Sequence, residues 1–86
     1  MRTIHKYILS PYNEKVDMLA GAKILHVGVQ RGAICIWAEV DTSAKFVERR
    51  FGVYGTGHTM PTEPGKYIGT VMLADGDLVF HIYERV

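Results

Sequence analysis

Hydrophobic and polar residues alternate along most of the chain with a period of two. The clearest case is residues 33–41, where Ile34, Ile36, Ala38 and Val40 share one face. Alternation among β-branched and aromatic residues indicates a β-strand. Strands are predicted at residues 3–9, 14–19, 23–30, 33–41, 45–54, 66–74 and 77–83. No stretch shows sustained helical periodicity, so the pattern predicts an all-β fold, a small antiparallel β-sandwich or open barrel of six to seven strands.

Two short turns organise the predicted sheet. Arg31-Gly32 and Asp75-Gly76 each join two predicted strands and have the length and composition of hairpin turns. The hairpin at residues 23–41 is largely apolar on both faces, a pattern typical of a strand pair that is covered on both sides. We expect either a second sheet or a second subunit to cover it, and we therefore predict a homo-oligomer.

Length and charge restrict the class of protein. The 86 residues predict a single domain, residues 1–86. Ten basic and nine acidic residues give a net charge of +1, which argues against a duplex DNA binder that works through phosphate contacts. No signal peptide or membrane-spanning run is visible, so we expect a soluble protein in the cytoplasm. Cys35 lies in an apolar run, which predicts a buried thiol.

The richest polar chemistry lies where the strand at residues 45–54 meets a long loop, residues 55–65. Guanidinium groups and hydroxyls suit phosphate, and glycines let successive backbone N–H groups converge on an anion. A nearby aromatic ring could stack on a base. The candidate ligand-binding residues are therefore Trp37, Arg49, Arg50, Tyr54, Gly55, Thr56, Gly57, His58 and Thr59.

These residues can also have a purely structural role. A glycine-rich loop can simply reverse the chain, and aromatic residues can simply pack the core. Arg49 would be the odd member of an apolar row, so either a bulge shifts the register or its side chain reaches a polar pocket. Arg49 and Arg50 point to opposite faces of a regular strand, so one site could use both only with a bulge or a subunit boundary.

The sequence lacks the motifs of the common nucleotide-binding loops, metal sites and catalytic nucleophiles. The Gly55–His58 segment lacks the Gly-Lys-Ser/Thr ending of a phosphate-binding P-loop, and no helix follows it as in a dinucleotide fold. The four histidines and the single cysteine have no metal-ligand spacing. No serine lies in a nucleophile motif. We therefore predict no catalytic residue, no metal and no cofactor, and we do not expect an enzyme.

The segments Tyr54-Gly55-Thr56-Gly57-His58 and Phe80-His81-Ile82-Tyr83 resemble those of a set of short, uncharacterised proteins from bacteriophages and prophages. The resemblance extends over nearly the whole chain. It implies a phage accessory protein that counters host defence in the host cytoplasm by binding, without catalysis. The expected function is sequestration of a nucleotide-derived signalling molecule. The alternatives are a protein-binding inhibitor of a host enzyme and, last, a small hydrolase that uses His58.

Overall fold

Seven β-strands make up most of the chain in the computed structural model, which describes residues 1–85. The elements are β1 (Arg2–Ile8), β2 (Lys15–Leu19), β3 (Lys23–Gln30), β4 (Ala33–Asp41), β5 (Phe46–Gly55), β6 (Lys66–Leu73), the short 3₁₀ turn η1 (Ala74–Gly76) and β7 (Leu78–Arg85). The predicted all-β fold of six to seven antiparallel strands is confirmed. Within residues 1–85 there is no helix long and apolar enough to cross a membrane.

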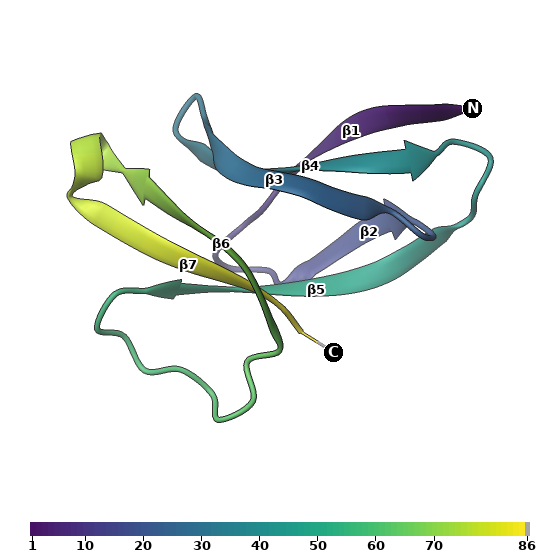
Figure 1. Ribbon diagram of the computed structural model, residues 1–86. Coiled ribbons are helices and arrows are strands. Elements are labelled where there is room, and N and C mark those ends of the chain that lie inside the picture. The colour runs from purple at the N-terminus through teal and green to yellow at the C-terminus, as the bar shows by residue number, and fades with distance from the viewer. Residues whose placement is uncertain (86) are drawn as a thin grey trace.

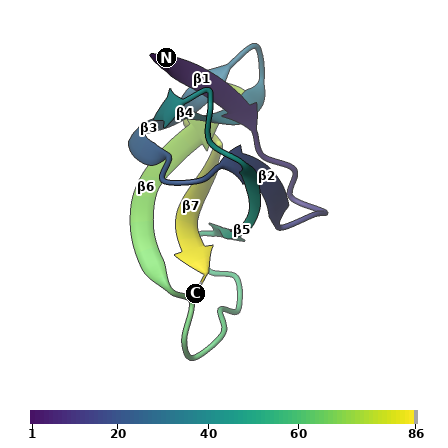
Figure 2. The same ribbon diagram turned by 90° about the vertical axis from the view of Figure 1, so that its right-hand side faces the viewer.

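The strands form two antiparallel sheets. The three-stranded sheet has the order β1-β4-β3, and the four-stranded sheet has the order β2-β5-β7-β6. Figures 1 and 2 show the two sheets as separate layers that face one another. The β3–β4 hairpin therefore has its inner face covered by the four-stranded sheet, which is the first of the two coverings expected from its sequence.

The core lies between the two layers. Its fully buried side chains come from both sheets, with Ile36 and Val40 on β4 meeting Met18, Phe51 and Ile82 from the opposite sheet. Each such side chain contributes about 1.5–3 kcal/mol relative to an exposed one. The alternation along β4 is kept throughout, because Ile34, Ile36, Ala38 and Val40 are all buried, as the pattern predicts.

Two β-bulges change the faces predicted for β3 and β6. The register of β3 shifts between Ile24 and His26, and that of β6 shifts between Tyr67 and Gly69. Strict alternation placed Leu25 with Val27 and Val29, but the extra residue leaves Leu25 47% exposed and turns Ile24 toward the core. Ile68 likewise packs against the core instead of sharing a face with Thr70 and Met72. One inserted residue has this effect because the side-chain period of a strand is two.

The outer face of the three-stranded sheet is only partly apolar. Cys35 is 1% exposed there, between its register partners Ile8 and Gly28. A Cβ at Gly28 would lie 2.9 Å from the His26 ring and 3.4 Å from the Trp37 ring, so both rings lie close over this glycine. Side chains of the same sheet therefore bury the thiol, as predicted, without a second subunit.

Candidate functional site

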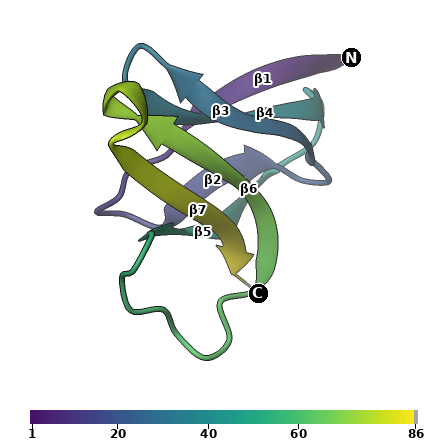
Figure 3. The same cartoon turned by 60° about the vertical axis from the view of Figure 1, so that its left-hand side comes forward.

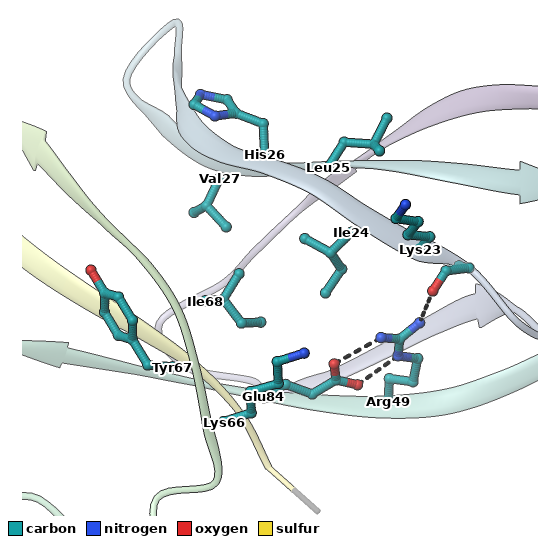
Figure 4. A pocket seen from close by; sticks show the side chains of 11 residues that line it. Lys23, Ile24, Leu25, His26, Val27, Arg49, Lys66, Tyr67, Ile68 and Glu84 are labelled. Atoms are coloured by element: carbon teal, nitrogen blue, oxygen red, sulfur yellow. Dashed lines mark hydrogen bonds and ion pairs between the residues drawn. The ribbon is translucent and has the colours of Figure 1, made fainter.

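A cleft opens between β3 of one sheet and β6 of the other. Its volume is about 420 Å³, within the range of roughly 300–1,000 Å³ that is usual for small-molecule sites. Figure 4 shows the side chains around it, which come from the β2–β3 connection, β3, β5, β6 and β7. The lining residues are Ala22, Lys23, Ile24, Leu25, His26, Val27, Arg49, Lys66, Tyr67, Ile68 and Glu84.

The cleft exists because two edge strands bend away from each other. Near one end, β3 and β6 pack closely, since a Cβ at Gly69 would lie 3.4 Å from the Cβ of Val27. Beyond this contact each strand carries its bulge, and the bulged residues Leu25 and Ile68 both line the cleft. Bulges are common at sheet edges and beside functional sites, where they redirect side chains. Here they blunt both edges and open the space between them.

Arg49 forms the polar end of the cleft. Its Nε and one terminal nitrogen donate to the two carboxylate oxygens of Glu84, at 2.6 and 2.7 Å, and the other terminal nitrogen donates to the Ala22 carbonyl at 2.7 Å. The two side chains are 21% and 22% exposed. The hydrogen bonds that Arg49 donates to the Glu84 carboxylate raise the pKa of Arg49 above its ordinary value. Arg49 therefore stays charged near neutral pH, and its contacts join β5 to β7 and to the turn before β3.

Two lysines add positive charge that no acid in the lining balances. Within residues 1–85, Lys23 and Lys66 take part in none of the ion pairs. Figure 4 shows Lys66 and Arg49 on either side of the Glu84 carboxylate. The lining thus holds three cations and one carboxylate, and that carboxylate is already bound by Arg49. Ile24, Val27 and Ile68 supply the apolar wall. This arrangement suits an anion that carries an apolar or planar body.

The structure separates the residues that the sequence singled out. Arg49 lies in the cleft, whereas Arg50 lies on the outer face of the same strand, 56% exposed and paired with Glu48 at 3.4 Å. No bulge interrupts the pairing of β2 with β5 at these positions, so Arg49 reaches a polar pocket, the second of the two alternatives. Trp37 lies on the other sheet, with its ring 5.9 Å from that of His26.

Tyr54 is also on the outer face of the four-stranded sheet. Its ring packs edge-on against Tyr83, at 5.9 Å between centroids, and its hydroxyl is buried without a hydrogen-bond partner in the described part of the chain. Gly52 leaves the space that the tyrosine hydroxyl occupies, because a Cβ at that position would overlap it. Tyr54 therefore packs across the sheet, on the face opposite to the cleft.

The glycine loop forms a separate, smaller pocket of about 150 Å³ that includes Gly55, Thr56, His58 and Asp77 in its lining. Two of the loop N–H groups already have partners, because Thr56 N–H donates to the Val79 carbonyl and His58 N–H donates to that of Gly55. The loop turns at Gly57, which has a φ of +84°. The expected convergence of N–H groups on an anion is thus reduced. Thr59, the last of the predicted residues, is exposed in this loop.

A chain of hydrogen bonds that the sequence did not reveal runs across the outer face beside this loop. His81 lies 2.7 Å from the Thr56 hydroxyl through Nε2 and 3.0 Å from the Thr70 hydroxyl through Nδ1. Tyr67 continues the chain with a 2.6 Å bond to Thr70. The chain fixes the beginning of the loop to β6 and β7. Thr70 and His81 are register partners on β6 and β7, so these contacts could be predicted only once the pairing of these two strands was known.

Sequence reasoning also missed Lys23, Lys66 and Glu84. Each looks like an ordinary charged residue near the end of a strand. Their grouping depends on two bulges and on the meeting of β3 with β6, and neither is visible in the alternation. Lys66 and Glu84 are register partners on β6 and β7, so a correct pairing of the last two strands would have brought them together.

The comparisons with known proteins give a family but no activity. A family described as "Domain of unknown function (DUF7352)" matches residues 1–86. No curated protein and no solved structure matches the chain.

Proposed function

The chain belongs to the DUF7352 family, a domain of unknown function, and from its geometry we propose that it binds a phosphate-bearing small molecule in the cleft between β3 and β6. Binding takes place without catalysis. The amines of Lys23 and Lys66 contact the phosphate, and the apolar wall contacts the rest of the ligand.

The observation that carries this proposal is the charge balance of the cleft. Three cations and one carboxylate line the cleft, and Arg49 occupies both oxygens of that carboxylate. Lys66, together with Lys23 beside its register partner Glu39, can therefore attract an anion into a partly enclosed space. A charge-assisted contact is worth more there than on an open surface. The whole chain has a net charge of only +1, so the excess of positive charge is specific to the cleft.

The shape of the cleft favours a nucleotide-like ligand over a bare phosphate. Ile24, Val27 and Ile68 form a wall that can cover a planar ring, and His26 lies at the same rim. Small-molecule sites usually combine an apolar lining with a few charged groups that fix orientation. Arg49 and Glu84 hold the floor of the cleft and are positioning residues here, since all three guanidinium nitrogens already donate within the chain.

The biological role that we propose rests on the phage resemblance described for the sequence. A small protein that holds a nucleotide without turning it over removes that nucleotide from solution, which is how a phage accessory protein in the host cytoplasm would silence a nucleotide-derived defence signal. The cleft supports the binding part of this proposal, and the resemblance alone supports the role.

Isothermal titration calorimetry tests the binding. Cyclic nucleotides, ADP-ribose and inorganic phosphate are titrated into the parent protein and into the Lys66→Ala and Lys23→Ala variants. We expect a nucleotide to bind more tightly than inorganic phosphate. Each lysine variant should lose roughly 1.5–3 kcal/mol, or about 10- to 150-fold in affinity.

Lys15→Ala is the matched control, because Lys15 is an exposed lysine of β2 that does not line the cleft. It should bind like the parent. The proposal fails if no nucleotide binds the parent, or if the Lys15 variant loses as much affinity as the two cleft variants.

A second candidate function is inhibition of a host protein. Ile4 and Ile8 are 56% and 62% exposed on β1, and β1 is the edge of its sheet. Such an edge can add a strand of another protein. This alternative is favoured if the parent binds no nucleotide but binds one host enzyme, and if the Ile4→Lys variant no longer binds that enzyme.

A further inference from the structure

An apolar pocket of about 250 Å³ lies at the opposite end of the interior from the bulges. Its lining includes Leu9, Pro11, Ile34, Val53, Leu73 and Phe80 and has no charged side chain. It lies among three turns, namely residues 10–13, 31–32 and 74–76, which Figure 3 shows along one side of the molecule. A pocket with so few polar groups holds water poorly and gains free energy from an apolar occupant.

Tyr12 follows Pro11, which lines this pocket, and its side chain is 97% exposed. It does not belong to a loose loop. The Tyr12 N–H donates to the Ser10 hydroxyl at 3.2 Å, the Asn13 N–H donates to the Ser10 carbonyl at 3.4 Å, and the Lys15 N–H donates to the Asn13 side chain at 3.1 Å. The turn is therefore braced on both sides of the tyrosine. A rigid turn that holds an aromatic side chain in solvent loses little entropy when that side chain is buried by a partner.

From these two features we propose that the chain forms a two-fold dimer in which Tyr12 of each copy enters the apolar pocket of the other. Pro11, the neighbour of Tyr12, lines the pocket, so the exposed ring projects from the turn that borders the hollow. A two-fold axis between two such surfaces places each ring opposite the hollow of the other copy, which is the self-complementary arrangement of symmetric dimers. Tyrosines seated in pockets are frequent centres of binding energy in interfaces.

The rim of the pocket favours a second copy of this chain as the occupant. Arg31 lies in one of its turns and Asp75 in another, and both are exposed. A surface that carries both signs can pair each charge with its opposite on a second copy, whereas a partner of one sign would leave one of them unmatched. A chain of 86 residues also buries a limited core by itself and gains from further burial.

Sedimentation analysis of the full chain from micromolar to millimolar concentration tests the proposal. The parent should approach twice its 9.7 kDa mass, and Tyr12→Ala should raise the dimer dissociation constant at least thirtyfold or so. Tyr12→Phe, which keeps the ring, should stay close to the parent. Val53→Leu, which enlarges a side chain in the wall of the pocket, should weaken the dimer without removing Tyr12.

Phe46→Ala serves as the matched control. Phe46 is 69% exposed and lies outside the pocket, so its removal takes away a large exposed apolar side chain and should leave the dimer unchanged. Thermal melts show that each variant is folded. A parent that remains at 9.7 kDa throughout overturns the proposal, as does a Tyr12→Ala variant that associates like the parent. If Tyr12→Ala weakens the dimer and Val53→Leu does not, the pocket is not the site where the ring binds.

Discussion

Replacing Arg49 by methionine should destabilise the fold far more than the same change at its neighbour Arg50. Methionine keeps most of the apolar stem of the arginine but lacks the guanidinium carbon, which lies 6.0 Å from the centre of the Phe51 ring. What the substitution removes is the charged group. It leaves the Glu84 carboxylate without its bidentate partner and the Ala22 carbonyl without its donor.

The size of the effect follows from burial. Breaking a fully buried ion pair by removing one partner costs roughly 3–5 kcal/mol. The Arg49 and Glu84 side chains keep about a fifth of their exposure, 21% and 22%, so water reduces this penalty, and we expect about 2–3 kcal/mol. Arg50 and Glu48 are 56% and 47% exposed and 3.4 Å apart. An exposed pair of this kind contributes roughly 0–1 kcal/mol.

Urea unfolding followed by the fluorescence of Trp37, the only tryptophan, measures the difference. Arg49→Met should lower the midpoint at an unchanged slope and lower the Tm by roughly 10–20 °C, and Arg50→Met should move neither by much. The double variant Arg49→Met with Glu84→Gln should cost less than the two single changes added together, because no charge is then left alone. Equal losses for Arg49→Met and Arg50→Met would refute the reasoning that sets the two arginines apart.

Three further outcomes are expected. Gly65→Ala should lower the Tm more than Gly57→Ala. Both glycines have a positive φ, which costs an alanine roughly 1–2 kcal/mol, but only at Gly65 would the new Cβ also overlap the Glu84 carbonyl. Equal losses of Tm would contradict this. Cys35 should react with a thiol reagent only as fast as the fold opens, since it is 1% exposed; labelling as fast as in urea would exclude its burial. The hydrogen bond and the charge of Arg2 lower the pKa of Glu39 below 4.5, so the contribution of this ion pair to stability is present above that pH and is lost as the pH falls through the lowered pKa. Glu39→Gln should therefore reduce the loss of stability between neutral and acid pH, and an unchanged loss would count against the ion pair.

The strands could be predicted because each of them buries one face. Along β4 the buried set is the one that alternation predicts, since no bulge interrupts that strand. In β3 and β6 the same logic failed at Leu25 and Ile68, because an inserted residue leaves the composition of a strand unchanged while it exchanges the two faces. The alternation rule is therefore reliable in the centre of a sheet and weak at an edge, where bulges are common.

The candidate site was harder to predict for the same reason. Arg49 stood out as a charge in an apolar row, and the structure gives it a polar pocket. Lys23 and Lys66 carried no such contrast, because a lysine at the end of a strand looks like any exposed residue. Their contribution appears only when the bulged edges of β3 and β6 lie across from each other, a contact between segments about 40 residues apart in the sequence.

The most direct measurement of the central proposal is a ¹H–¹⁵N correlation spectrum of the labelled protein during titration with a nucleotide, with inorganic phosphate as a second titrant. Binding in the cleft should shift the amides of Lys23, Ile24, Lys66 and Ile68 first and should leave those of Gly57 and Thr59 in place. Shifts confined to the glycine loop, or a spectrum that does not change with any nucleotide, would contradict the assignment of the cleft between β3 and β6 as the binding site.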